Sequence, residues 1–253
     1  MTSKIILITG ANSGVGLATA KVLGQSPEDF HIVMAGRSLD KVEEAKSELE
    51  ASGVPKNRLS AVQLDVTDNS SIQQAASFVE DKFGRLDVLI NNAGVYSTDP
   101  DIQTRFRVSL ETNVTGPVLV SLAFRSLLLK SPGPYSLYVS SVLGSIGLSD
   151  NPKSELYRSL PASIASVYRA SKAALDMVVV QESIEMSSTG MKVFALCPGF
   201  VVSNLRGTSE QARTGGGKAG DPEVSGKTIL SIVRGERDGD AGKFVHKDGV
   251  YPW

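Results

Sequence analysis

Residues 4–16 read K-I-I-L-I-T-G-A-N-S-G-V-G, an apolar run that passes directly into a glycine-rich segment. An apolar run without polar alternation is typical of a strand buried on both faces. Glycines after such a strand let the backbone bend tightly and approach a phosphate, and the following helix offers free N–H groups at its positive end. A flexible turn is the alternative, but its place in the first strand–helix unit favours a phosphate-binding turn of a dinucleotide site. The residues expected to form it are Gly10, Asn12, Ser13, Gly14, Val15 and Gly16.

The rest of the chain repeats this alternation of short apolar runs with longer amphipathic stretches. The expected strands are 4–9, 31–35, 59–64, 87–92, 136–140, 191–196 and 242–246. The expected helices are 18–23, 39–50, 71–82, 108–130, 168–187 and 222–234. Repeated strand–helix units with fully apolar strands predict an α/β fold with a doubly wound parallel sheet and helices on both faces. No repeat or linker divides the sequence, so we expect one domain over residues 1–253 of about seven strands.

Composition narrows the class of function. The formal net charge of −1 leaves no strong basic field for nucleic acid or an anionic membrane. No apolar stretch approaches the length of a membrane span, and no signal-peptide pattern opens the chain. The one cysteine, Cys197, ends an apolar run and is expected in the core of a protein from a reducing compartment. We therefore expect a cytoplasmic protein with a small-molecule partner and no metal site.

Five motifs follow one another along the chain. They are T-G-x-x-x-G-x-G at Thr9–Gly16, N-N-A-G at Asn91–Gly94, S-x-x-G at Ser141–Gly144, Y-x-x-x-K at Tyr168–Lys172 and P-G-x-V-x-S at Pro198–Ser203. Each is weak alone, but in this order the chain resembles the short-chain dehydrogenases/reductases over essentially its whole length. The resemblance implies a Rossmann-type single domain, a nicotinamide cofactor, and hydride transfer to or from a carbonyl or alcohol carbon.

The Tyr168–Lys172 pair is the expected catalytic centre. Residues four apart share one helix face. A cation about 4 Å from the phenol at an effective dielectric near 20 favours phenolate by roughly 4 kcal/mol, or about three pK units. Tyr168 would then act as an acid or base near neutral pH. A surface pair is the alternative, and Tyr157 is a competing tyrosine with Pro161 where a lysine is required.

The resemblance implies further catalytic roles. Ser141 would hydrogen-bond the substrate oxygen, and it fits the S-x-x-G pattern better than Ser140. Asn113 would bind a water in a proton relay through Lys172. Residues implied to line the cofactor are Asn91, Ala93, Gly94, Tyr168, Lys172, Pro198, Gly199, Val201 and Ser203. Ser203 would contact the carboxamide end.

The choice of cofactor depends on the end of the second strand. Arg37 stands where a carboxylate would hold a ribose 2′-hydroxyl, and an arginine there can clamp a 2′-phosphate. This favours NADP(H) over NAD(H), although Arg37 could equally be a solvated residue before a helix capped by Ser38. Asp65 and Val66 are expected to hold the adenine, with a helix start as the alternative for Asp65.

The sequence departs from the family between Ser141 and Tyr168, which are farther apart than in much of that family. The extra segment resembles the longer insertions of carbonyl-reductase-like members, which cover the substrate mouth and can interfere with tetramer packing, so a homo-oligomer stays open. The leading hypothesis is an NADPH-dependent reductase of a ketone or aldehyde with Tyr168 as proton donor. The alternatives are an NAD-dependent alcohol dehydrogenase and a non-catalytic NADP-binding regulator. A mixed, mostly apolar pocket is expected from Tyr96, Leu143, Ile146 and Phe200.

Overall fold

One sheet forms the centre of the computed structural model, which describes residues 3–154 and 162–253. Its strand order is β3-β2-β1-β4-β5-β6-β7-β8. The strands are β1 (Lys4–Thr9), β2 (Phe30–Gly36), β3 (Leu59–Gln63), β4 (Val88–Asn91), β5 (Tyr135–Val139), β6 (Lys192–Leu196), β7 (Phe244–His246) and β8 (Gly249–Tyr251). The order reverses direction between β1 and β4, which in open α/β sheets is the crevice where ligands bind.

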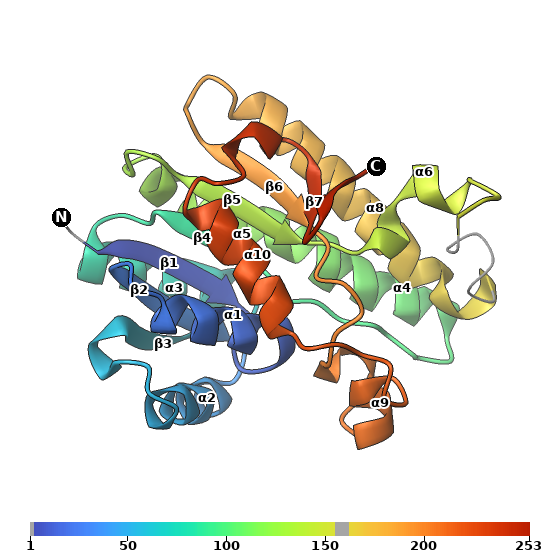
Figure 1. Cartoon of the computed structure of the whole chain (residues 1–253), viewed down its shortest axis with the longest axis horizontal. Helices are drawn as coiled ribbons and strands as arrows, with labels where there is room; N and C mark the ends of the chain where they lie inside the picture. Colours follow the sequence, from blue (N-terminus) through green and yellow to red (C-terminus); the bar gives the residue numbers. More distant parts are fainter. Residues whose placement is uncertain (1–2, 155–161) are drawn as a thin grey trace.

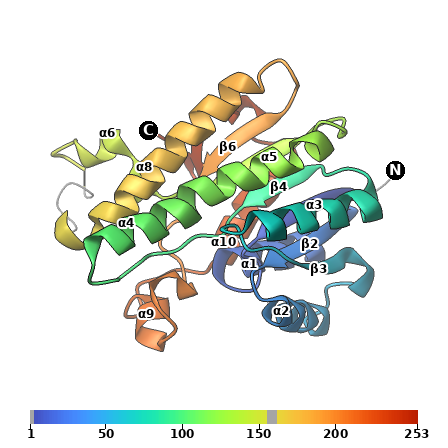
Figure 2. The ribbon, with the colours of Figure 1, turned by 180° about the vertical axis from the view of Figure 1, so that it is seen from behind.

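Helices cover both faces of this sheet, as Figures 1 and 2 show from opposite sides. The helices are α1 (Gly14–Gln25), α2 (Leu39–Ala51), α3 (Asn69–Phe83), α4 (Ile102–Leu110), α5 (Gly116–Leu128), α6 (Ile146–Ser149), α8 (Ala162–Glu185), α9 (Glu210–Thr214) and α10 (Glu223–Val233). Helices α1, α2 and α10 lie on one face, and α3, α5 and α8 lie on the other. Each face buries its own apolar cluster, which explains why the strands are apolar at nearly every position.

The predicted α/β Rossmann-type single domain is confirmed, with two local differences. The helix expected over 108–130 is α4 followed by α5, joined by one π-helical turn at Glu111–Thr115. An eighth strand, β8, was not predicted and pairs antiparallel with β7, with Val245 opposite Val250. An antiparallel neighbour needs only a short turn, so the few residues after β7 are enough to add it.

Candidate active site

The glycine turn lies at the carboxyl end of β1 and opens α1. Gly10 and Gly14 both have positive φ, at 65° and 56°, which side chains rarely adopt. Ser13 stands at the N-cap of α1 but makes no side-chain capping bond, and no acidic residue occupies the first turn. The positive dipole end of this helix is therefore not neutralised by a carboxylate of its first turn.

Two polar residues that sequence reasoning missed hold this turn against β4. The Thr9 Oγ1 accepts the N–H groups of Asn92 and Ala93, both at 3.0 Å. The Asn92 Nδ2 donates to the carbonyls of Thr9 at 2.8 Å and Gly10 at 3.2 Å. Both residues belong to quoted motifs at the ends of adjacent buried strands. The adjacency of these strand ends could have predicted that Thr9 and Asn92 contact one another.

Gly16 explains why the turn needs glycine at a third position. A Cβ on Gly16 would lie 2.5 Å from the Gly10 carbonyl oxygen and 2.6 Å from the Asn92 Nδ2. The start of α1 therefore approaches the turn more closely than any side chain permits. Asn92 and Gly16 together keep the two ends of the glycine turn in contact.

The residues expected at the adenosine end lie beside one another. Arg37 is exposed, and no described residue forms a hydrogen bond or ion pair with its guanidinium. The Asn12 Oδ1 lies on the same side, 3.3 Å from where a Cβ on Gly36 would stand. Asp65 uses one carboxylate oxygen to accept from the Thr67 N–H at 2.9 Å and the Thr67 hydroxyl at 2.8 Å. Val66 is buried against Gly116.

Tyr168 lies on α8, on the side that packs against β6 and the short 3-10 turn η3 (Val142–Gly144). Its side chain is 8 % exposed. Burial raises the pKa of Tyr168 above its ordinary value, and the nearby Cys197 thiol adds to this. Hydrogen bonding to Ser141 and the charge of Arg206 lower that pKa by less. The phenol is consequently protonated at neutral pH.

The predicted effect of Lys172 on the acidity of this phenol stays a prediction, because burial is the largest influence on the pKa of Tyr168. The Lys172 Nζ donates to the Val139 carbonyl at 2.8 Å and lies 5.8 Å from the centroid of the Tyr168 ring. Burial lowers the pKa of Lys172 to about 8, although Asp176 and Cys197 act to raise it. A lysine that loses its proton near pH 8 is charged at neutral pH, so it can stabilise a phenolate formed there but not one formed at higher pH.

Asn113 occupies the π-helical turn between α4 and α5 and is fully buried. Its Oδ1 accepts the Val95 N–H at 2.8 Å, and its Nδ2 donates to the Val95 carbonyl at 2.9 Å and to the Ser171 Oγ at 3.0 Å. π-turns inside α-helices occur frequently at functional sites. One amide N–H braces the loop at Val95 and the other binds Ser171 on α8, so a relay water would bind the remaining lone pair of Oδ1 or the backbone carbonyl.

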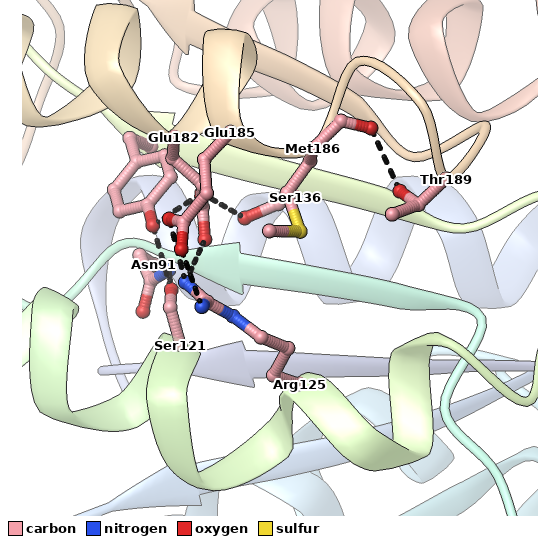
Figure 3. Close-up of polar contacts among 9 residues, drawn as sticks. Asn91, Ser121, Arg125, Ser136, Glu182, Glu185, Met186 and Thr189 are labelled. Atoms are coloured by element: carbon pink, nitrogen blue, oxygen red, sulfur yellow. Dashed lines mark hydrogen bonds and ion pairs between the residues drawn. The ribbon is translucent and has the colours of Figure 1, made fainter.

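Asn91 lies beneath the site, with a side chain that is 3 % exposed. Its Nδ2 donates to the Ser121 Oγ at 3.0 Å, and Ser121 contacts the Tyr138 hydroxyl at 2.7 Å. Tyr138 in turn donates to Glu182 at 2.6 Å, and Figure 3 shows this network reaching Arg125 near the surface. The Asn91 side chain therefore connects β4 to α5 and α8 below the crevice. Any contact between Asn91 and a cofactor can come only from the Asn91 backbone.

The loop after β6 carries the last motif toward the glycine turn. The Ser203 Cβ lies 3.1 Å from where a Cβ on Gly14 would stand. A cavity of about 640 Å³ borders both residues. Pro198 accepts a hydrogen bond from the Ser225 hydroxyl at 2.8 Å, and Val201 is buried. Gly199 is the backbone bend between them, with φ of 80°.

Comparison with known proteins assigns the family. The model of the short chain dehydrogenase family matches residues 4–214. The chain is 33% identical to the short-chain dehydrogenase/reductase tropE of Talaromyces stipitatus, over 97% of this chain and 96% of the relative. It is 34% identical to a farnesol dehydrogenase of Aedes aegypti, over 80% of this chain and 79% of the relative. The chain belongs to the short-chain dehydrogenase/reductase family.

A solved relative of this short-chain dehydrogenase/reductase has a similar fold. The NADPH-bound carbonyl reductase from chicken fatty liver matches with a TM-score of 0.81 and 27% identity, covering 100% of both chains. The carbonyl reductase Sniffer of D. melanogaster matches with a TM-score of 0.78 over 100% of both chains, at 23% identity, which shows the fold alone. The chain is thus an oxidoreductase of this family with carbonyl reductases among its structural neighbours.

The residues expected to line the substrate pocket of this short-chain dehydrogenase/reductase lie in three places. The ring of Tyr96 lies 5.3 Å from that of Tyr168. Phe200 is exposed and packs under the Arg206 guanidinium, whose centre lies 4.4 Å from the ring centroid. Leu143 and Ile146 line a shallow depression beside α8. Tyr157 and Pro161 in the expected insertion lie outside the described residues.

The C-terminal segment folds back over this side of the sheet. Trp253 stacks on Phe244 with ring centroids 5.7 Å apart, and its carbonyl accepts the Gly147 N–H at 2.8 Å.

Among the described residues, no helix is long and apolar enough to cross a bilayer. The same residues contain no group of three or more histidine, cysteine or acidic side chains placed to hold a metal ion.

Proposed function

We propose that this protein is an NADPH-dependent reductase of ketones or aldehydes. The observation that carries the proposal is the buried, protonated Tyr168 phenol, which lies beside Ser141 at the carboxyl end of the sheet. A phenol that keeps its proton at neutral pH is suited to donate it, and less suited to act as the base that alcohol oxidation requires. The NAD-dependent alcohol dehydrogenase is therefore the weaker alternative.

The residues fit a nicotinamide dinucleotide. The uncapped start of α1 and the positive-φ glycines form an anion site for the pyrophosphate. Ser203 and Gly14 lie together on the loop side of this turn. When bound, the nicotinamide supplies the hydride for the reduction. Arg37 is free of protein partners and exposed, so it can form charge-assisted hydrogen bonds to a 2′-phosphate.

The chain's own residues account for the rest of the reaction. Ser141 donates a hydrogen bond to the substrate oxygen and stabilises the negative charge that develops there. Tyr168 transfers its Oη proton to that oxygen, which completes the alcohol. Tyr96 presents aromatic surface next to Tyr168, and Phe200 is exposed on the loop after β6, which favours a moderately apolar carbonyl compound.

The proposal is tested by the loss of NADPH absorbance with a panel of ketones and aldehydes. Tyr168→Phe is expected to remove turnover while NADPH binding, followed by its fluorescence, is retained. Tyr251→Phe is the matched control, because no described residue forms a hydrogen bond with its hydroxyl and it lies in β8. Turnover that survives Tyr168→Phe would refute the proton donor, and tight NADPH binding without turnover of any substrate would favour a non-catalytic regulator.

The cofactor preference has its own test. Arg37→Asp is expected to weaken NADPH binding by roughly 10- to 100-fold more than NADH binding, the loss of one charge-assisted contact. Lys41→Asp makes the same charge change one turn into α2, where the side chain is also exposed. Equal losses for NADPH and NADH in Arg37→Asp would overturn the assignment to the 2′-phosphate.

A further inference from the structure

Two buried polar side chains behind the active site lack hydrogen-bond partners. Both carboxylate oxygens of Asp176 and the Ser140 hydroxyl are enclosed and make no hydrogen bond to any described residue. Asp176 is 4 % exposed and Ser140 is 2 % exposed. Leaving a carboxylate in this state is costly, and a leucine or asparagine would fill the space more cheaply. A cost of this kind beside a candidate active site indicates a role in the chemistry.

The positions of these groups connect them to Lys172. Asp176 follows Lys172 by four residues on α8, so both project from the same face of the helix. Ser140 directly follows Val139, whose carbonyl accepts the Lys172 Nζ at 2.8 Å. Ser140 also directly precedes Ser141, which lies beside Tyr168. Helix α8 and the carboxyl end of β5 thus enclose Lys172, Asp176 and Ser140 together.

The charges in this enclosure oppose one another. Burial raises the pKa of Asp176 to about 7, while Ser140 and the charge of Lys172 lower it. Burial lowers the pKa of Lys172 to about 8, while the Asp176 carboxylate acts to raise it. The end of β6 adds the Cys197 thiol, whose pKa is raised by burial and which faces the same groups. Lys172 and Asp176 therefore titrate in the same range near neutral pH and depend on each other.

The dependence matters because Lys172 assists Tyr168 only while it is charged. Without a neighbouring carboxylate, a fully buried lysine loses its proton at a still lower pH. A charged Lys172 lowers the cost of the phenolate that remains when Tyr168 has given up its proton. Among the described residues, the Asp176 carboxylate and, by less, the Cys197 thiol are the acidic groups that act to raise the pKa of Lys172.

We infer that Asp176 is a positioning residue for the proposed reduction, which keeps Lys172 protonated behind Tyr168 and shares its enclosure with Ser140. The inference rests on the proposed function but concerns different atoms. No bond is made or broken by Asp176 and no proton needs to leave the enclosure. Its effect is electrostatic and acts on the pH range in which Tyr168 can donate a proton.

The first experiment is the pH profile of kcat/KM for reduction by NADPH. In Asp176→Asn, the basic limb is expected to move to lower pH by about one unit, roughly a tenfold loss on that limb. We expect kcat to fall while the KM for NADPH changes little, because Asp176 touches neither ligand. Glu182→Gln is the matched control: it removes another buried carboxylate from the same helix, but one bound to Tyr138 and Ser136. Equal movement of the limb in both variants would overturn the inference.

The second experiment needs no turnover. Infrared difference spectra recorded across a pH titration should show the C=O band of a carboxylic acid that disappears near neutral pH. The band should be absent in Asp176→Asn and changed in frequency in Ser140→Ala. In Lys172→Met the midpoint should rise, because the cation that lowers the pKa of Asp176 is gone. A midpoint unchanged by Lys172→Met, or a band that survives Asp176→Asn, would refute the coupling.

The two experiments separate the inference from the proposed function. If the wild-type protein reduces no carbonyl compound, the proposed function fails, and the infrared titration still decides whether Asp176 and Lys172 titrate together. If the wild-type protein is active and Asp176→Asn leaves both the profile and the band unchanged, the inference alone is wrong. Because Asp176→Asn could fail to fold, Ser140→Ala and Lys172→Met provide the same infrared test with Asp176 in place.

Discussion

Gly144→Ala is a sharp test of how the active-site loop is held. Gly144 ends the 3-10 turn η3 that follows Ser141, and it packs directly on α8. A Cβ at this position would lie 2.7 Å from the Lys172 carbonyl carbon, 2.9 Å from the Ala173 nitrogen and 2.9 Å from the Lys172 Cβ. Two of these atoms belong to helix backbone, which cannot rotate away. The loop itself must therefore move.

The size of the movement follows from these distances. An ordinary contact of about 3.5 Å requires a shift of roughly 0.8 Å, and overpacking of this kind typically costs about 1–3 kcal/mol. For a chain of this length, each kcal/mol lowers Tm by roughly 2–4 °C. The shift also carries Ser141 away from Tyr168, and a misplacement near 1 Å can cost about 100-fold in rate. We expect kcat to fall much more than NADPH affinity, because the glycine turn is untouched.

The assay compares Gly144→Ala with Gly133→Ala by thermal unfolding and by steady-state reduction. Gly133 lies in the loop before β5, and a Cβ there would meet no atom within 4 Å. The control therefore carries the same loss of backbone freedom without the close approach. If the two variants have the same Tm and the same kcat, Gly144 is not required for loop packing and the reasoning from the Cβ distances is refuted.

Three further predictions concern buried polar groups. Thr9→Val removes the acceptor of two backbone N–H groups at the glycine turn. We expect urea unfolding to show a loss of about 1–3 kcal/mol in stability, together with weaker NADPH binding. Unchanged stability and binding would contradict the role of Thr9. Reduction by the wild-type protein should decline above about pH 8 as Lys172 loses its proton; a profile flat to pH 10 would contradict this. Burial raises the pKa of Glu182 in the folded protein. The resulting contribution to stability is complete below the pKa that Glu182 has in the unfolded chain, and it is lost as the pH rises through the pKa in the folded protein. The free energies of unfolding of Glu182→Gln and of the wild type should therefore be compared at acid and neutral pH. Their difference should shift in favour of the variant as the pH rises, and a constant difference would show that Glu182 does not titrate.

The order of elements and the motifs could be predicted because their signals are local. Fully apolar runs between amphipathic stretches indicated a parallel sheet covered on both faces, which the structure has. The roles of Gly10 and Gly14 in the turn could be predicted because glycine readily adopts the positive φ that both residues have. The π-helical turn at Asn113 and the antiparallel β8 were missed, because neither differs in local pattern from an ordinary helix or a tail.

The sequence by itself determined the fold, the glycine turn and which residues were expected to carry the chemistry, since these depend on spacing and side-chain type. Only the tertiary structure decided their charge. Tyr168 and Lys172 are one helical turn apart as expected, but burial leaves the phenol protonated and weakens the hold of Lys172 on its proton. Ser140 and Asp176 meet there from distant parts of the chain. Desolvation is set by everything packed around a group, and no pattern of neighbours in the sequence records it.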